Sequence, residues 1–252
     1  MNADILLEAL VLPTSSRVDQ RVSKRLLLEN GGHTAASKRL INEGMDELFW
    51  LAALKPTTVG VPEYRDDTRE YLEIAVLRLT MRPMAKAARL VDLVHRAIPY
   101  PLLLLAEQDE RTGLSVAHKR WSHSEAGKTV LEGDVVSIEW EGEGNGQYWP
   151  SFCEAVSLGH QPQTALHLLY QGWVDTLLAF KAAHLTGSFS PAINATHAGV
   201  RRDALQEYAR CASEIARLRG AAAKEKQMSR RVDLNLEVQR IEAAKAVALA
   251  KL

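Results

Sequence analysis

The segment HRAIPYPLLLLAEQDERTGLSVAHKRW, residues 95–121, decides the fold that this sequence predicts. A nearly unbroken apolar run predicts a strand over residues 101–107 that is buried on both faces. A polar turn follows, and residues 114–121 then alternate between apolar and polar side chains, as a second strand does. One face of that second strand carries Leu114, Val116, His118 and Arg120.

The flanking sequence extends this pattern on both sides. Residues 71–80 predict a central strand, residues 84–97 have the apolar spacing of a helix, and residues 129–140 predict a strand pair or one long strand. Residues 46–54 are apolar enough for either a strand or a helix. The order strand–helix–strand–strand–strand predicts an α+β fold, with a small mixed sheet and flanking helices.

The composition changes after residue 160 and becomes helical. Residues 164–185 carry apolar side chains every three or four positions, which predicts a helix. A heptad spacing then links Ala204, Tyr208, Cys211, Ile215, Leu218 and Ala222, and a second stripe links Leu234, Val238, Ile241, Ala248 and Leu252. One long helix and a hairpin near residues 220–229 both fit. We therefore predict an α+β domain over residues 1–160 and a helical region over residues 161–252 with a coiled-coil arm.

Composition limits the partners and the compartment. The 31 Lys and Arg residues balance the 31 Asp and Glu residues, so no global charge favours nucleic acid. Residues 201–252 nevertheless carry twelve bases against seven acids, a net charge of +5. Cys153 and Cys211 are far apart, no signal peptide is evident, and no apolar run could span a bilayer. We expect a cytoplasmic protein without a membrane anchor.

Two groups of basic residues are candidates for contact with DNA phosphates. The first is the run His118, Lys119 and Arg120 at a strand end, and the second is Arg17, Arg21, Lys24 and Arg25 near the N-terminus. Both groups also have a structural interpretation. Cations can pair with helix or strand ends, and edge strands carry basic side chains that block aggregation. The sequence leaves both interpretations open.

The sequence offers no complete catalytic or metal-binding set. A restriction-type nuclease needs an Asp and a Glu-x-Lys on adjacent strands. Asp109 or Glu107 could combine with Glu73, but Ala75 stands where the lysine should follow. The histidines at positions 160, 167 and 184 lack the spacing of a zinc pair on a helix. We therefore predict no catalytic residue, no metal and no cofactor.

Five stretches of the sequence resemble one bacterial family. They are HRAIPYPLLLL at residues 95–105, LSVAHKRW at 114–121, KEKQMSRRVDLNLEVQRIE at 224–242, RVDQRVSKRLLLENG at 17–31 and LKPTTVGVPEY at 54–64. Together they are similar to the domain-of-unknown-function family four-three-nine-one. The resemblance implies a gene neighbourhood of SNF2-type helicases and DNA methyltransferases in restriction-like anti-phage clusters. It implies no catalytic residue.

The expected function is that of a non-catalytic accessory subunit of such a defence complex, bridging a helicase or methyltransferase partner and in contact with DNA. The arm would supply the protein contact, to this partner or to an identical chain. Its candidate interface residues are Tyr208, Cys211, Ile215, Leu218, Leu234, Val238 and Ile241. Two alternatives remain, a metal-dependent nuclease and a stand-alone DNA-binding adaptor.

Overall fold

The computed structural model describes residues 3–31, 34–125, 127–141 and 146–252. Contacts divide the chain into two compact units, Met1–Leu177 and Leu178–Leu252. The two units are described separately below. Within the described ranges, no helix has the length and apolar character needed to cross a membrane.

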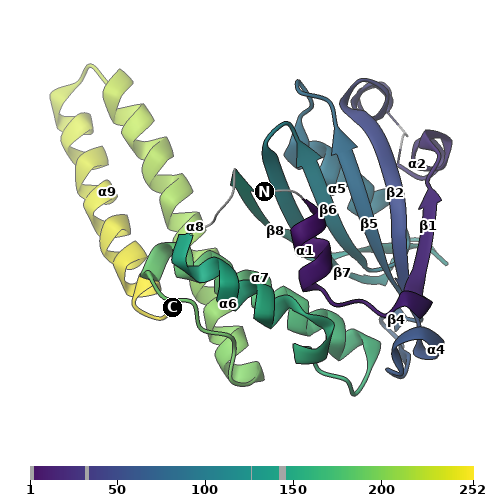
Figure 1. Ribbon diagram of the computed structural model, residues 1–252. Helices are drawn as coiled ribbons and strands as arrows, with labels where there is room; N and C mark the ends of the chain where they lie inside the picture. The colour runs from purple at the N-terminus through teal and green to yellow at the C-terminus, as the bar shows by residue number, and fades with distance from the viewer. Residues whose placement is uncertain (1–2, 32–33, 126, 142–145) are drawn as a thin grey trace. The chain divides into compact units, whose positions relative to one another are not determined.

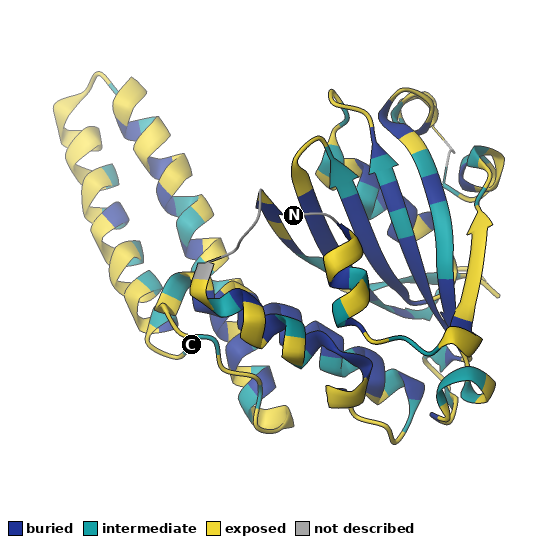
Figure 2. Cartoon of the chain, viewed as in Figure 1, coloured by how far each residue is buried: buried dark blue, intermediate teal, exposed yellow. Residues whose placement is uncertain are grey.

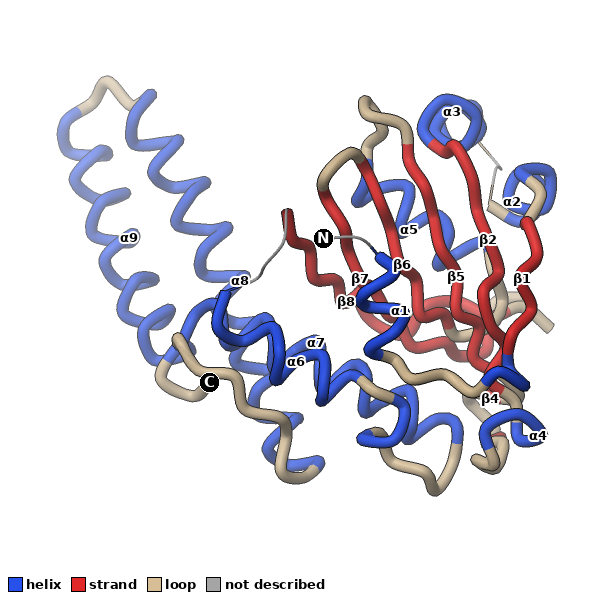
Figure 3. The backbone as a smooth tube through the Cα atoms, viewed as in Figure 1, coloured by secondary structure: helices blue, strands red, loops and turns tan. Residues whose placement is uncertain are grey.

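The first unit is built on a six-stranded mixed sheet (Figure 3), which confirms the α+β prediction. Its spatial order is β1-β2-β5-β6-β7-β8, and all neighbours are antiparallel except β5 and β6. A short hairpin, β3–β4, stands apart from this sheet. The strands are β1 Arg17–Arg21, β2 Met45–Leu54, β3 Tyr64–Arg65, β4 Glu70–Tyr71, β5 Ile74–Met81, β6 Leu102–Gln108, β7 Arg111–Trp121 and β8 Thr129–Glu141.

The parallel pair β5–β6 requires a crossover, and the helix α5, Ala87–Ala97, supplies it. The predicted order strand–helix–strand–strand–strand is therefore confirmed as β5-α5-β6-β7-β8. Residues 46–54, which sequence left open, form strand β2. The predicted strand over residues 71–80 is wrong at its start, because Tyr71 pairs with Tyr64 in the small hairpin before β5 begins.

Helices cover both faces of the sheet (Figure 1). One face packs on α2, Lys24–Asn30, on the π-helical turn Leu40–Gly44 that follows α3, Ala35–Arg39, and on α5. The other face lies under α1, Ala3–Ala9, and the first half of α7, Leu166–Thr186. The remaining short elements are η1 Thr14–Ser16, α4 Pro56–Val59, η3 Gly146–Tyr148, α6 Trp149–Val156 and η4 Leu158–His160. Two covered faces explain why β5 and β6 are largely buried and mostly apolar (Figure 2), with Arg78 in β5 and Glu107 near the end of β6 as the charged residues of the pair.

Tyr170 of α7 joins the sheet where the pairing of β6 and β7 ends. The last pair joins Leu103 and Val116, and beyond it β7 continues alone on that side. The buried Tyr170 hydroxyl accepts a hydrogen bond from the amide of Ala117 at 2.7 Å and donates to the carbonyl of Leu102 at 2.7 Å. One side chain thus replaces the missing ladder bonds and fixes the start of α7 on the sheet.

Strand β1 forms one edge of the sheet, and all five of its residues are exposed. Its register with β2 shifts between Arg17 and Gln20, where Asp19 has a φ of 48°. Bulges and charged side chains at an edge hinder pairing with another chain. The geometry therefore supports the interpretation that these basic residues protect an edge strand.

The second unit contains α8, Ala195–Lys224, and α9, Met228–Leu249, joined by a turn at residues 225–227. The arm is a hairpin rather than one long helix. Its core is made by Ile215, Leu218 and Val238, against which Leu234 and Ile241 pack. The coiled-coil character that the heptad spacing indicated stays a prediction.

We expect Tyr170→Phe to lower the free energy of unfolding of the first unit by about 2 kcal/mol, because it leaves a buried amide and carbonyl without their partner. All five tryptophans lie within residues 1–177, so urea unfolding followed by their fluorescence reports this unit. Tyr100→Phe is the control, since the Tyr100 side chain is exposed. Equal stability of the two variants would contradict the role of the Tyr170 hydroxyl.

Candidate functional site

His118, one of the predicted phosphate-binding residues, belongs instead to a half-buried polar cluster. The Tyr71 hydroxyl lies 2.5 Å from its Nδ1, and Gln171 Oε1 lies 2.9 Å from its Nε2. Gln171 in turn donates to Asp175 at 2.8 Å. Burial raises the pKa of Tyr71 above its usual value, so the phenol keeps its proton and donates to His118.

His167 extends this cluster toward the β3–β4 hairpin. Its ring stacks on Tyr64 at 5.0 Å and meets the ring of Tyr71 edge-on at 4.9 Å. Arg69 donates to His167 Nε2 at 3.2 Å and to Glu132 at 3.0 Å. Burial, together with the Arg69 charge, lowers the pKa of His167. The imidazole is therefore neutral at physiological pH.

This Tyr–His cluster joins β4, β7, β8 and α7, and its hydrogen bonds run between these elements, with Glu132 Oε2 left as a buried oxygen without a hydrogen-bond partner. The sequence alone did not bring them together, because Tyr71 and His167 are almost a hundred positions apart. The alternation of β7 did predict that His118 faces away from Lys119. Within the described parts of the chain, no group of three or more His, Cys, Asp or Glu residues is arranged to hold a metal ion.

Lys119 does not fit the predicted role in phosphate binding, because its side chain is buried with an exposure of 2%. Its ammonium donates to the carbonyls of His95 and Ile98, the latter at 2.8 Å. These carbonyls end α5, where a cation complements the partial negative charge of the helix terminus. Burial lowers the pKa of Lys119 to about 7. Alternation along β7 turns this residue toward the face that α5 covers.

Arg120 likewise leaves no open basic surface at this strand end. Its side chain is half-buried, and its guanidinium donates to the carbonyl of Trp121 at 2.9 Å. The three adjacent residues that the sequence suggested as a docking surface therefore point into different internal contacts.

The N-terminal basic residues stay at the surface, but most are balanced by acids. Arg21 pairs with Glu47 at 3.2 Å and Arg25 with Glu29 at 2.7 Å. Arg17 lies 3.9 Å from Asp19, and the ammonium of Lys24 donates to the carbonyl of Met45 at 2.5 Å. Each local pair reduces the positive field that a phosphate would meet.

The acids of the nuclease alternative are spread over the sheet. Glu73 precedes β5 and pairs with Lys55 at 3.0 Å, whereas Glu107 is near the end of β6 and pairs with Arg78 at 2.7 Å. Because β5 and β6 are parallel, these carboxylates lie at opposite ends of the sheet, about 20 Å apart. Asp109 lies in the β6–β7 turn. The described acids do not meet as a shared metal site.

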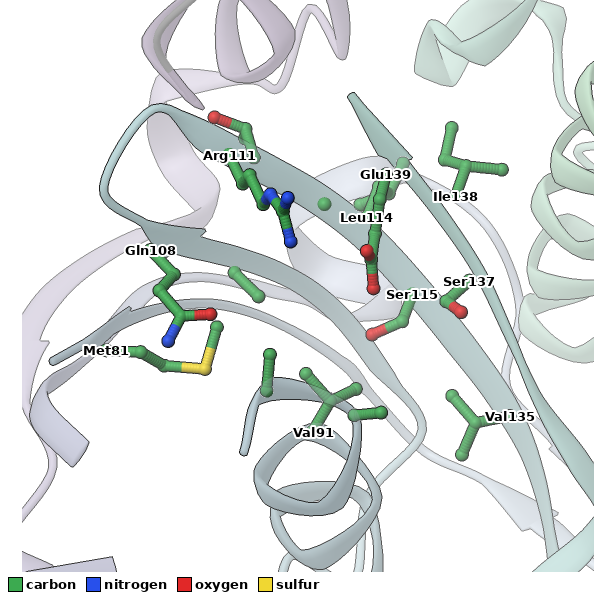
Figure 4. Close-up of a pocket in the computed structure, with 15 residues that line it drawn as sticks. Met81, Val91, Gln108, Arg111, Leu114, Ser115, Val135, Ser137, Ile138 and Glu139 are labelled. Atoms are coloured by element: carbon green, nitrogen blue, oxygen red, sulfur yellow. The ribbon is translucent and has the colours of Figure 1, made fainter. Parts of the chain in front are cut away.

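A cavity of about 200 Å³ lies between α5 and strands β6, β7 and β8 (Figure 4). Its wall is mostly apolar and includes the hydroxyls of Ser115 and Ser137. Ser115 Oγ lies 2.9 Å from Nε2 of His95, which is fully buried. The distance is that of a nucleophile and its base, but burial lowers the pKa of His95 to about 3 and makes it a weak base. The pair therefore fastens α5 to β7.

The predicted partner-interface residues are used inside the hairpin. Cys211, Ile215, Leu218 and Val238 are buried, and Leu234 and Ile241 pack against them. Tyr208 lies under the ammonium of Lys245, 4.6 Å from the ring centre. The seam that the sequence assigned to another chain closes α8 onto α9, so its interface role is corrected to an intramolecular one.

The hairpin turn presents a basic group that our sequence reasoning did not single out. Lys224, Lys226, Arg230 and Arg231, here called the basic tip, are all exposed. Within the described residues none of the four forms an ion pair, although Arg231 donates to the sulfur of Met228 at 3.0 Å. The net charge of +5 over residues 201–252 was the available signal. Only the turn gathers these bases at one end of a helix pair.

Comparison with known families gives a match over residues 10–244 to the family described as Domain of unknown function (DUF4391). The chain belongs to this family. The sequence resemblance is thereby confirmed over nearly the whole chain. Neither the curated proteins nor the solved structures contain a match.

We expect Lys119→Ala to destabilise the first unit by about 2 kcal/mol or more, because two carbonyls lose a buried donor and the lysine stem leaves a void. Lys128→Ala is the control, since that exposed side chain pairs with exposed Glu125. Urea unfolding measures both. A stable Lys119→Ala that binds DNA less well than wild type would restore the phosphate-binding interpretation.

The burial of His95 predicts that the free energy of unfolding decreases in acid. The unfolded imidazole takes up a proton near pH 6.5, whereas the folded one, with a pKa of about 3, does not. The unfolded chain therefore binds more protons between these values, and stability falls as the pH drops from 6.5 toward 3. Relative to His95→Gln, wild type should lose stability over this range and keep a constant difference above about pH 7.5. A pH-independent difference would show that His95 is not buried as a neutral group.

Proposed function

We propose that the protein is a non-catalytic accessory subunit of a restriction-like anti-phage complex in the bacterial cytoplasm. In this role it bridges a helicase or methyltransferase partner and DNA. The observation that carries the proposal is the basic tip of the α8–α9 hairpin, with its four exposed bases. Membership of the DUF4391 family supports the context, since the sequence resemblance implies gene clusters of this kind.

The basic tip differs from the other basic groups because few acids lie beside its bases. Residues 224–231 carry four bases and one acid, Glu225, whose carboxylate accepts a hydrogen bond from the amide of Gln227. The N-terminal bases have acids beside them, and Lys119 is buried. Unpaired exposed cations release condensed counterions when they meet phosphates, which favours binding to DNA of any sequence.

The other polar groups support a binding role over catalysis. Lys119, the Tyr–His cluster and the Ser115–His95 pair each hold two or more elements of the first unit together. A group that fastens the fold is restricted in the proton transfers and movements that a reaction needs. We therefore propose that the protein acts through its surfaces.

The proposal predicts that Lys224→Ala, Lys226→Ala and Arg230→Ala, combined in one variant, weaken binding to two unrelated DNA duplexes alike. If all three bases contact phosphate, the slope of log affinity against log salt should fall by about 2.7. Arg231 is kept because it contacts Met228. Fluorescence anisotropy over a salt series measures the effect.

The matched control carries Arg17→Ala, Arg21→Ala and Arg25→Ala, which removes the same charge from the paired N-terminal group. It should bind DNA as wild type does. Equal slopes for wild type and the tip variant would contradict DNA contact by the tip. Purification of the tagged protein from its own operon should recover a helicase or methyltransferase; recovery of the chain alone would favour the stand-alone adaptor.

A further inference from the structure

Helix α9 has two apolar faces. The inner face, with Leu234, Val238 and Ile241, packs in the hairpin seam. The outer face consists of Met228, Val232, Leu236 and Val247, whose exposed fractions are 64%, 48%, 58% and 58%. At 3.6 residues per turn these four side chains fall within an arc of about 100°. Met228, Val232 and Leu236 lie on the side of α9 opposite the seam, whereas Val247, at the edge of the arc, borders a groove that Val200 and Ala204 of α8 also line.

This outer stripe is more than the usual scatter of exposed apolar side chains. Ala243 and Ala246 lie on the same arc and are also exposed, and between Leu236 and Ala243 the exposed polar side chain of Gln239 interrupts the stripe. On α8, which is longer, Val200 is the one large hydrophobic residue with comparable exposure among those described. An exposed apolar stripe along one helix is typical of a surface that a further helix covers.

The charges beside the stripe are complementary to a second copy of α9. Asp233 and Arg240 lie on one flank, and Arg231 and Glu242 lie on the other. When a second α9 runs antiparallel with a two-fold axis between residues 236 and 237, Asp233 faces Arg240 of that copy. In the same register Arg231 faces Glu242 of that copy, and the two Leu236 side chains meet near the axis. The apolar and charged residues thus specify the same register.

We propose that the outer stripe of α9 pairs antiparallel with the same stripe of a second copy, giving a two-fold symmetric dimer. The two-fold symmetry repeats both charge pairs, so four ion pairs border one apolar seam of about 27 Å, the length over which residues 228–245 of the two copies overlap in this register. A parallel pairing would place both basic tips side by side, whereas the antiparallel one puts them at opposite ends. Asp233 forms no ion pair within the described residues, whereas Arg240 contacts Glu237 of its own helix at 3.2 Å and Glu242 contacts Arg219 of α8 at 2.5 Å. Both of these pairs are exposed, so the dimer would exchange them for the pairs with the copy.

Sedimentation equilibrium tests the dimer on the full chain. The average mass of wild type should rise from one chain toward two between about 1 and 200 µM, as a small interface predicts. Leu236→Glu places two carboxylates at the axis and should stay at the mass of one chain throughout. Ile193→Glu, an equal change at an exposed apolar position that precedes α8, should dimerise as wild type does.

A charge exchange tests the register. Asp233→Arg should raise the dissociation constant at least about tenfold, because it faces Arg240 of the copy. Adding Arg240→Asp should restore it to within about threefold, whereas in a parallel pair the double variant would be weaker still. Circular dichroism checks that each variant keeps its helices.

A wild type that stays at one chain mass, a Leu236→Glu variant that dimerises normally, or a charge exchange without rescue would each overturn the proposal. The dimer does not depend on DNA contact. The tip variant should dimerise normally. The Leu236→Glu variant should keep, per chain, the wild-type slope of log DNA affinity against log salt. The two proposals can therefore fail separately.

Discussion

The parallel pairing of β5 and β6 is the constraint on which the first unit depends. Two neighbouring parallel strands cannot be joined by a tight turn, so α5 must cross one face of the sheet between them. Contacts from β7 then hold that helix in place. Lys119 binds the carbonyls at its last turn, and Ser115 binds His95 from the same side of the strand. Lys119, which the sequence suggested as a functional residue, and His95 therefore complete the packing of the crossover helix.

On the opposite face of the sheet, other polar side chains also join the strands to the elements that cover them. Tyr170 fills the gap where β6 and β7 part, and the Tyr–His cluster ties the β3–β4 hairpin to β7 and α7. Buried polar groups are costly unless they are paired, and here the pairs span elements that are distant in sequence. Polarity in the first unit thus serves specificity of the fold.

In the second unit, apolar residues form the internal contact, and basic and further apolar residues stay exposed. Its heptad seam is consumed by the contact between α8 and α9, and what remains outside is a basic tip and an apolar stripe on α9. A tip that attracts phosphate and a stripe that pairs with a second copy are compatible, because the antiparallel register places the two tips at opposite ends. Arg231 of each tip would face Glu242 of the copy, which leaves Lys224, Lys226 and Arg230 for phosphate. Such a dimer would present two separate anion-binding ends to DNA.

The sequence by itself determined the order of the central elements, the α+β class and the helical character of the C-terminal region. Periodicity and runs of apolar residues are local signals, so they predict β6, α5 and the helical stripes well. Only the tertiary structure decided that Lys119 is buried, that His118 meets His167, and that the heptad seam closes within the chain. These outcomes depend on which element covers which face and on where a helix turns back. Both are set by contacts between residues far apart in the chain, for which one sequence carries no local signal.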